Sequence, residues 1–316
     1  MKLIILIPAF NEENTIGELI LKIPRKISGI DSVQVLVVND GSTDNTIDTA
    51  LNVGADKIVS HKNNMGVGAA FMTGIRNAIS MGADIVVTLD ADSQFDPKQV
   101  NEIIIPIQNH QADVVVGSRF VNEAPEDIPK IKLVGNRIFT KIVSWLVGQK
   151  FTDTQSGFRA YSKEALMNIS VVNDFTYTQE VLIDLKFKGM KIEEIPVSVT
   201  YFKGRKSRVV KNTFHYTSRA LSVIIRTLTY HKPIFTFGFL GAVLITGGIL
   251  TKIITITRIF GGGISSDLSS GIIILGIVSF MMGLFASVVF KRQTFAEKDL
   301  RHYIKQQNER DDDLKY

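Results

Sequence analysis

The chain has 316 residues, a formal net charge of +5, 45% hydrophobic residues and no cysteine. The absence of cysteine excludes a disulfide scaffold, a thiolate metal site and a thiol nucleophile. The length is enough for one large domain or two ordinary ones. The averages hide a segregation of charge, because residues 1–202 sum to −5 and residues 203–232 to +8.

Short aliphatic runs alternate with helical patterns in the N-terminal part of the chain. Strands are predicted at 3–7, 33–38, 57–60, 84–89 and 113–117, and helices at about 14–27, 44–53, 67–81 and 97–110. Strands that alternate with helices predict an α/β fold with a doubly wound, mostly parallel sheet. Ligands bind such sheets at the carboxyl ends of the strands, so the residues after each strand are the functional candidates.

A basic segment follows this region. Residues 203–232 contain eight basic and no acidic side chains, and Phe214, Leu221, Ile225 and Leu228 recur at helical spacing. This pattern predicts an amphipathic helix over about 209–232 that lies on an anionic membrane surface. A nucleic-acid partner is not expected, because membrane-spanning runs follow directly.

Two apolar runs come next, at about 234–257 and 271–290. Each is long enough to cross a bilayer, which takes about 20 residues. Basic residues before the first run and Lys291 and Arg292 after the second place both outer flanks in the cytoplasm and the connector outside. We therefore expect a multi-pass protein of the cell membrane, or of an ER-type membrane, with the N-terminal region and both termini cytosolic. A pair of buried soluble helices is the alternative, and charge-free runs of this length disfavour it.

The two ends of the chain give fewer indications of structure and function. The LIILI stretch at 3–7 is too short for a signal peptide. The charged residues 291–316 predict a helix that is solvated or contacts a second copy of the chain. The expected divisions are thus 1–208 as a cytosolic domain, 209–232 as the interfacial helix, 233–290 as the spans and 291–316 as a cytosolic tail.

Polar motifs follow the predicted strands. In chain order they are PAFNEE at 8–13, NDGSTD at 39–44, NMGVGA at 64–69, DADSQ at 90–94 and GSR at 117–119. Acids at three strand ends and an arginine at another would all face one crevice at the same edge of the sheet.

Asp90 and Asp92 are the strongest candidates for a chemical role. Two carboxylates two residues apart at a strand end can both approach Mg²⁺ or Mn²⁺, which fill their other positions with water and substrate phosphate. The same pattern also occurs at helix N-caps and in solvated turns. The apolar strand before it, Gln94 beside it and Asp40 at a neighbouring strand end favour the metal site.

The ordered motifs resemble the family 2 inverting glycosyltransferases with the GT-A fold. Within that family the chain is similar to the polyprenyl-phosphate hexosyltransferases of the dolichyl-phosphate mannose synthase kind. The resemblance covers about residues 1–210 and includes DTQSGFRAYSK at 153–163 and Gly74 in addition to the motifs above. Each motif alone is weak, but the ordered series is specific.

The resemblance implies a role for each matched position. The nucleotide sugar would be bound by Pro8, Phe10, Glu12, Val38, Asp40, Asp90, Ala91, Asp92 and Gln94. Asp90, Asp92 and Gln94 would hold the Mg²⁺ or Mn²⁺. Asp92, Arg119 and Arg137 would be the catalytic residues, the two arginines binding the acceptor phosphate, and residues 156–159 would shape the acceptor side.

One loop departs from the family. The usual Arg-x-Gly-x-Ser-Lys is replaced by KGRKSR at 203–208, where Lys203, Arg205, Ser207 and Arg208 are expected to bind phosphates. Which of them contacts the donor and which the acceptor is left open. The Gln-x-x-Arg-Trp motif of processive synthases is missing, because the only tryptophan is Trp145, in Ser144-Trp145-Leu146.

The predicted reaction is metal-dependent transfer of a hexose, with inversion, from a nucleotide sugar of the GDP-mannose or UDP-glucose type. The acceptor is a polyprenyl or dolichyl phosphate, which is already largely ionised at neutral pH and needs no strong base. One alternative keeps the fold and changes the acceptor to a protein, a glycolipid or a sugar. Another is a non-catalytic membrane protein that binds nucleotide sugar. The motifs do not choose the sugar, the polyprenol or the metal.

Overall fold

The computed structural model describes residues 1–122, 128, 130–169, 177–200, 222, 225–226, 228–230, 232–257 and 266–313, with the backbone alone at 130–132, 257, 266 and 293–313. The chain divides into two compact units, Met1–Ser207 and Arg208–Tyr316. The predicted interfacial helix and the loop at 203–208 fall almost entirely outside the described residues.

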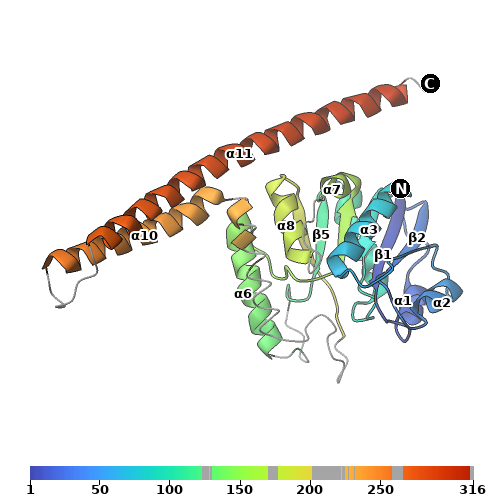
Figure 1. Ribbon diagram of the computed structural model, residues 1–316. Helices are drawn as coiled ribbons and strands as arrows, with labels where there is room; N and C mark the ends of the chain where they lie inside the picture. Colours follow the sequence, from blue (N-terminus) through green and yellow to red (C-terminus); the bar gives the residue numbers. More distant parts are fainter. Residues whose placement is uncertain are drawn as a thin grey trace. The chain divides into compact units, whose positions relative to one another are not determined.

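A seven-stranded sheet forms the centre of the first unit, in the order β3-β2-β1-β4-β6-β5-β7 (Figure 1). The strands are β1 Lys2–Ala9, β2 Ser32–Asn39, β3 Lys57–Ser60, β4 Ile85–Thr88, β5 Val114–Ser118, β6 Arg159–Ser162 and β7 Ile192–Pro196. Strand β6 runs antiparallel to β4 and β5, and the other pairs are parallel. The predicted mostly parallel α/β fold is confirmed.

Burial of the central strands explains their composition. Leu3 to Ile7 in β1 are all fully buried, as expected for a strand covered by helices on both faces. Strand β4 is buried along its whole length. These continuous aliphatic runs fix the register of the sheet, and they bring the loops that follow the parallel strands to one edge.

Helices fill the connections between the strands. They are α1 Ile16–Lys22, α2 Thr46–Asn52, α3 Val67–Ser80, α4 Val100–Ile103, α5 Ile105–Gln108, α6 Lys130–Val147, α7 Lys163–Asn168 and α8 Thr178–Phe187. The single helix predicted at 97–110 is wrong. It is divided into a 3₁₀ turn at Pro97–Gln99, α4 and α5. Pro106 has no N–H to continue a helical ladder, which explains the break between α4 and α5.

The second unit contains α10, Pro233–Thr257, and α11, Ser266–Asp313. Segments Pro233–Ile256 and Asp267–Arg292 are long and apolar enough to cross a membrane. The two helices pack together, and the Ser279 hydroxyl donates a hydrogen bond to the Phe237 carbonyl at 2.9 Å. Helix α11 continues through the charged residues to Asp313 without a break in its described backbone.

Candidate functional site

The predicted site residues of the first unit follow four parallel strands. Phe10 and Glu12 follow β1, Asp40 follows β2, Asp90 and Asp92 follow β4, and Arg119 follows β5. Because β1 pairs in parallel with both β2 and β4, the first three of these loops emerge side by side.

Hydrogen bonds join the loops after β1 and β2. The backbone N–H of Asn11 donates to Ser42 Oγ at 2.9 Å, and the Asn11 side chain accepts from the Thr43 N–H at 2.8 Å. The Glu12 N–H donates to Thr46 Oγ1 at 2.8 Å. Asn11 has a φ of +54°, a conformation that asparagine tolerates better than most residues. One side of the site is thus built from two connected loops.

Asp40 is buried and holds the loop after β3. Its carboxylate accepts from the Met65 and Gly66 N–H groups at 2.9 and 2.8 Å, and contacts His61 Nδ1 at 2.7 Å. The other ring nitrogen of His61 lies 2.9 Å from Thr73 Oγ1 on α3. Sequence reasoning did not select His61, although its position directly after β3 was a signal. The expected contact of Asp40 with the donor stays a prediction.

Asp90 and Asp92 lie together after β4. Burial raises the pKa of Asp90 to about 7, and the charge of Asp92 adds to the shift, while Arg119 and Arg159 act against it. Asp92 Oδ1 accepts from the Gln94 N–H at 3.1 Å, so the turn is held by its own carboxylate. Two acidic groups that oppose each other's ionisation suit a divalent cation, which would relieve the repulsion.

The backbone of Gly157 packs against the Asp90 carboxyl group. A Cβ at this position would lie 2.7 Å from Asp90 Oδ2 and 2.8 Å from Oδ1. The Gly157 carbonyl accepts from Thr88 Oγ1 at 2.5 Å. Arg159 is fully buried and donates to carbonyl groups, including that of Ser156 at 2.9 Å. The segment at 156–159, expected on the acceptor side, therefore also supports Asp90.

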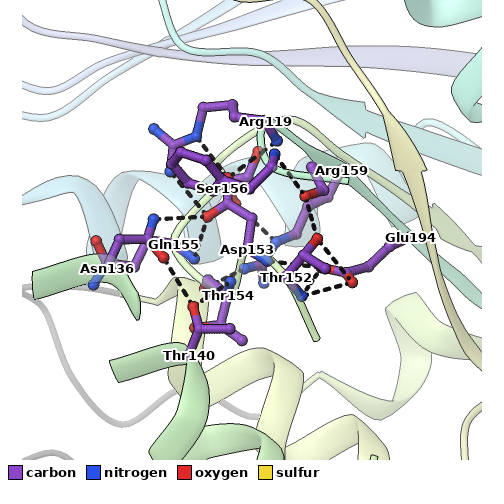
Figure 2. A network of polar contacts seen from close by, with 12 residues as sticks. Arg119, Asn136, Thr140, Thr152, Asp153, Thr154, Gln155, Ser156, Arg159 and Glu194 are labelled. Carbon is purple, nitrogen blue, oxygen red and sulfur yellow. Dashed lines mark hydrogen bonds and ion pairs between the residues drawn. The ribbon is translucent and has the colours of Figure 1, made fainter. Parts of the chain in front are cut away.

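Arg119 forms a two-point ion pair with Asp153 (Figure 2). Arg119 Nε lies 2.6 Å from Asp153 Oδ2, and Nη2 lies 2.9 Å from Oδ1. Asp153 is fully buried. Burial would raise its pKa, but the Arg119 charge and the hydrogen bonds to the carboxylate outweigh burial and lower it. Asp153 thus holds the guanidinium in one orientation.

A wider network holds Asp153 in turn (Figure 2). Asn136 on α6 donates to Asp153 Oδ1 at 3.0 Å, and Thr140 donates to Asn136 Oδ1 at 2.8 Å. Glu194 on β7 accepts from the N–H groups of Thr152 and Asp153. Burial raises the pKa of Glu194 despite these hydrogen bonds. Side chains from α6, from β7 and from the loop after β5 therefore meet around Asp153, α6 and the loop at its carboxylate and β7 at its backbone N–H.

An open pocket of about 660 Å³ lies beside this network, lined by Arg119, Asn122 and residues 196–199 among others. It is at the carboxyl ends of β5 and β7. Arg119 is therefore placed on the wall of a pocket large enough for part of a substrate.

The other predicted residues are placed differently. Val38 and Ala91 are buried in the interior of the unit. Pro8 is partly exposed, whereas Arg137 is exposed on α6. Lys203, Arg205, Ser207 and Arg208 lie outside the described residues.

Solved structures share this fold. One is glucosyl-3-phosphoglycerate synthase from Mycobacterium tuberculosis, in complex with Mn²⁺, uridine-diphosphate-glucose and phosphoglyceric acid. Its TM-score is 0.55 at 23% identity, over 72% of this chain and 78% of that chain. The shared fold is the GT-A fold, and the family model that matches the chain defines its class as a glycosyltransferase.

The family follows from the sequence comparison. The chain belongs to glycosyl transferase family 2, whose model matches residues 4–170. It is 35% identical to UDP-N-acetylglucosamine--dolichyl-phosphate N-acetylglucosaminyltransferase of Methanococcus voltae, over 62% of this chain and 85% of that relative. It is 28% identical to undecaprenyl-phosphate mannosyltransferase of Micrococcus luteus, over 63% of this chain and 83% of that relative.

Proposed function

We propose that this glycosyltransferase transfers a sugar, with inversion, from a nucleotide sugar to a polyprenyl phosphate in the membrane. The two relatives above are named for different sugars and for the same class of lipid phosphate. Their shared acceptor class supports the proposed acceptor. Because their sugars differ, we propose a hexose or an N-acetylhexosamine donor and leave the choice to a donor panel.

The observation that carries the proposal is the placement of Arg119 relative to the acidic pair. Asp90 and Asp92 follow β4, and Arg119 follows β5 on the wall of an open pocket. The Arg119 charge also acts to lower the pKa of Asp90, so the two groups are close enough to interact electrostatically. An arginine is well suited to bind a phosphate, and its pairing with Asp153 reduces the freedom that binding would otherwise cost.

Asp90, Asp92 and Gln94 fit a divalent cation. Among the described residues, no three His, Cys, Asp or Glu side chains gather as a metal site. A cation held by the Asp90–Asp92 pair would therefore take its other ligands from phosphate and water, as Mg²⁺ and Mn²⁺ commonly do. When bound, it would neutralise charge on the departing nucleoside diphosphate.

The proposed reaction is a single displacement. An oxygen of the acceptor phosphate forms a bond to the anomeric carbon, and the bond from that carbon to the nucleoside diphosphate breaks. The displacement inverts the configuration at the anomeric carbon. The phosphate nucleophile is already ionised at neutral pH, so the residues of this chain bind and orient the two substrates and need not remove a proton.

We also propose that the catalytic unit, Met1–Ser207, and both termini are cytosolic. The spans are flanked by basic residues on their outer sides, and the connector at 258–265 has one arginine and no lysine. This distribution follows the positive-inside rule. In this orientation the site uses cytosolic nucleotide sugars.

The test is an in vitro transfer assay with the full-length protein in membranes. Labelled GDP-mannose, UDP-glucose and UDP-N-acetylglucosamine are each supplied with a polyprenyl phosphate, with Mg²⁺, Mn²⁺ or a chelator. We expect a labelled lipid with at least one donor, and none after chelation. The proposal would be overturned if none of the donors gave a labelled lipid.

Two variants control this assay. Asp92→Asn should reduce transfer by about a hundredfold or more, as does the loss of other groups that stabilise developing charge. Asp48→Asn removes a carboxylate from the exposed surface of α2 and should leave transfer unchanged. Equal losses in both variants would contradict the assigned site.

A further inference from the structure

The carboxylate of Asp40 is oriented by groups of the loop that follows β3. Its Oδ1 lies 2.7 Å from His61 Nδ1 and accepts the Met65 N–H at 2.9 Å, and its Oδ2 accepts the Gly66 N–H at 2.8 Å. The side chains of Asp40 and His61 are only 5% and 10% exposed. Met65 and Gly66 contribute backbone groups, so His61 is the partner whose contact depends on the identity of its side chain.

The imidazole of His61 joins Asp40 to helix α3. Its Nε2 lies 2.9 Å from Thr73 Oγ1, so the ring has a partner at each nitrogen. Rotation of the ring about its Cβ–Cγ bond would break both contacts. Since a carboxylate only accepts hydrogen bonds, Nδ1 is the donor to Asp40, and the contact with Thr73 holds that nitrogen in place.

The loops after β2 and β3 are also in backbone contact. The His61 N–H donates to the Asn39 carbonyl at 2.9 Å. Gly41 has a φ of +76°, and a Cβ there would lie 2.6 Å from the carbonyl carbon of Asn63. The backbone on both sides of Asp40 is thus fixed by the packing of the two loops, and the hydrogen bonds to its carboxylate fix the side chain.

Asp40 keeps the capacity to accept a hydrogen bond from a ligand. The two oxygens of a carboxylate have about four lone-pair positions in total. Among the described residues, Oδ1 has the partners His61 and Met65, whereas Oδ2 has Gly66. The remaining position on Oδ2 suits one N–H of a nucleobase or one hydroxyl of a ribose. Where this position points depends on the rotation of the carboxylate, which His61 restrains.

We propose that His61 is a positioning residue for the donor nucleotide. By donating to Oδ1 of Asp40, and by contacting Thr73 with its other nitrogen, it directs Oδ2 toward an N–H or O–H group of the nucleoside. This inference rests on the proposed function, because it takes Asp40 to contact the nucleotide sugar. His61 acts through Asp40 and does not itself touch the substrate.

The test measures the affinity of the full-length protein in detergent micelles for UDP and for GDP, each with Mg²⁺, by titration calorimetry. His61→Phe keeps a flat ring and removes both ring nitrogens. We expect it to weaken nucleotide binding by about tenfold or more, because hydrogen bonds to charged groups are stronger than those between neutral groups.

The transfer assay gives a second reading of the same variant. The donor KM should rise, while kcat and the acceptor KM change little, because a contact made equally with the substrate and the transition state affects KM alone. A role in folding alone would lower the Tm of His61→Phe and leave both the nucleotide affinity and the donor KM as in the wild type.

Two further substitutions separate the ring nitrogens. The amide nitrogen of asparagine can take the place of Nδ1, and that of glutamine the place of Nε2. His61→Asn should therefore restore most of the affinity that His61→Phe loses, whereas His61→Gln should not. His110→Asn is the matched control and should bind nucleotide as the wild type does. His110 is exposed and has a φ of +55°, a conformation that asparagine tolerates.

The possible results distinguish this inference from the proposed function. Equal nucleotide affinity in His61→Phe and the wild type would overturn the inference, and so would equal affinity in His61→Asn and His61→Gln, a comparison that decides even if His61→Phe does not fold. A wild-type protein that binds neither nucleotide would overturn the donor site and this inference with it. Nucleotide binding without lipid transfer would overturn the proposed acceptor and leave the role of His61 intact.

Discussion

Arg119 and Asp153 are joined at two points, with Nε 2.6 Å from Oδ2 and Nη2 2.9 Å from Oδ1. The arginine side chain is 15% exposed and the aspartate is fully buried. The pair therefore connects a pocket wall with the interior of the catalytic unit. Its orientation depends on Asn136 from α6 and on the loop that Glu194 holds.

Asp153→Asn tests this connection. The change removes the buried negative charge and leaves Arg119 without its ionic partner, which typically costs about 3–5 kcal/mol. We expect a clear fall in Tm and weaker binding of the acceptor, seen as a raised KM for polyprenyl phosphate. Glu18→Gln, which breaks the exposed pair with Lys22, should leave both quantities unchanged. An unaltered acceptor KM in Asp153→Asn would show that the pair serves stability alone.

Gly157→Ala tests the support of the acidic pair. The added Cβ would come within 2.8 Å of both Asp90 carboxylate oxygens, so the carboxyl group must shift. We expect activity to fall roughly tenfold or more, because displacing a catalytic group by about 1 Å can reduce the rate about a hundredfold. We also expect the variant to need a higher metal concentration for half-maximal rate. Gly135→Ala on α6, where the new Cβ meets nothing within 4 Å, is the control. A normal metal requirement in Gly157→Ala would contradict the assigned contact.

The partly buried carboxyl of Glu194 predicts a pH effect on stability. Its pKa is raised by burial, so its contribution is fully present below the unfolded pKa of about 4.3 and is lost as the pH rises through the folded value. Because the side chain of Glu194→Gln does not titrate, the Tm of this variant relative to wild type should rise as the pH increases from about 4 through the raised pKa of Glu194. Glu193→Gln, on the exposed side of β7, is the matched control. A Tm difference between Glu194→Gln and wild type that stays constant with pH would contradict the expectation.

Features that depend on a local sequence pattern were predictable, whereas contacts between residues far apart in the chain were not. The sheet and the Asp90–Asp92 turn were predictable, because a continuous aliphatic run that ends in acids is a local pattern. Strand β6, Arg159–Ser162, begins with an arginine and ends with a serine, so it contains no aliphatic run and gives no such local signal. The role of Asp153 in holding Arg119 could not be predicted from the sequence either. Its partner Arg119 is 34 positions away, and no spacing rule predicts that contact.

The exposed side of α6, which includes Val134, Ile138 and Trp145, is a second feature that local patterns did not predict. Amphipathic spacing shows that a helix has two faces but does not show whether both are covered. The exposures of Val134 and Ile138 became informative only when the fold had placed Asn136 and Thr140 inside.

The absence of cysteine makes the proposed topology directly testable. Asp48→Cys on α2 and Asp267→Cys at the start of α11 each introduce a single thiol at an exposed position. In intact cells, a maleimide that cannot cross the membrane should label Asp267→Cys, whereas Asp48→Cys should react only after permeabilisation. The reverse pattern would overturn the cytosolic placement of the catalytic unit.

The packing of the two apolar helices depends on glycine. A Cβ at Gly241 would lie 2.7 Å from the Gly276 carbonyl oxygen, and a Cβ at Gly276 would lie 2.8 Å from that of Gly241. Small residues at such contacts let membrane helices approach closely. Gly241→Leu should therefore separate α10 from α11 at a cost of about 1–3 kcal/mol or more. We expect faster hydrogen exchange of both helices in detergent micelles.

Gly247 offers the control on the same helix, because a Cβ there meets nothing within 4 Å. Gly247→Leu adds the same apolar volume to α10 and should leave exchange as slow as in the wild type. If both leucine variants exchanged equally fast, glycine would matter for the helix itself and not for the contact with Gly276. Fast exchange in Gly241→Leu alone would establish that this pair of glycines holds the two helices together.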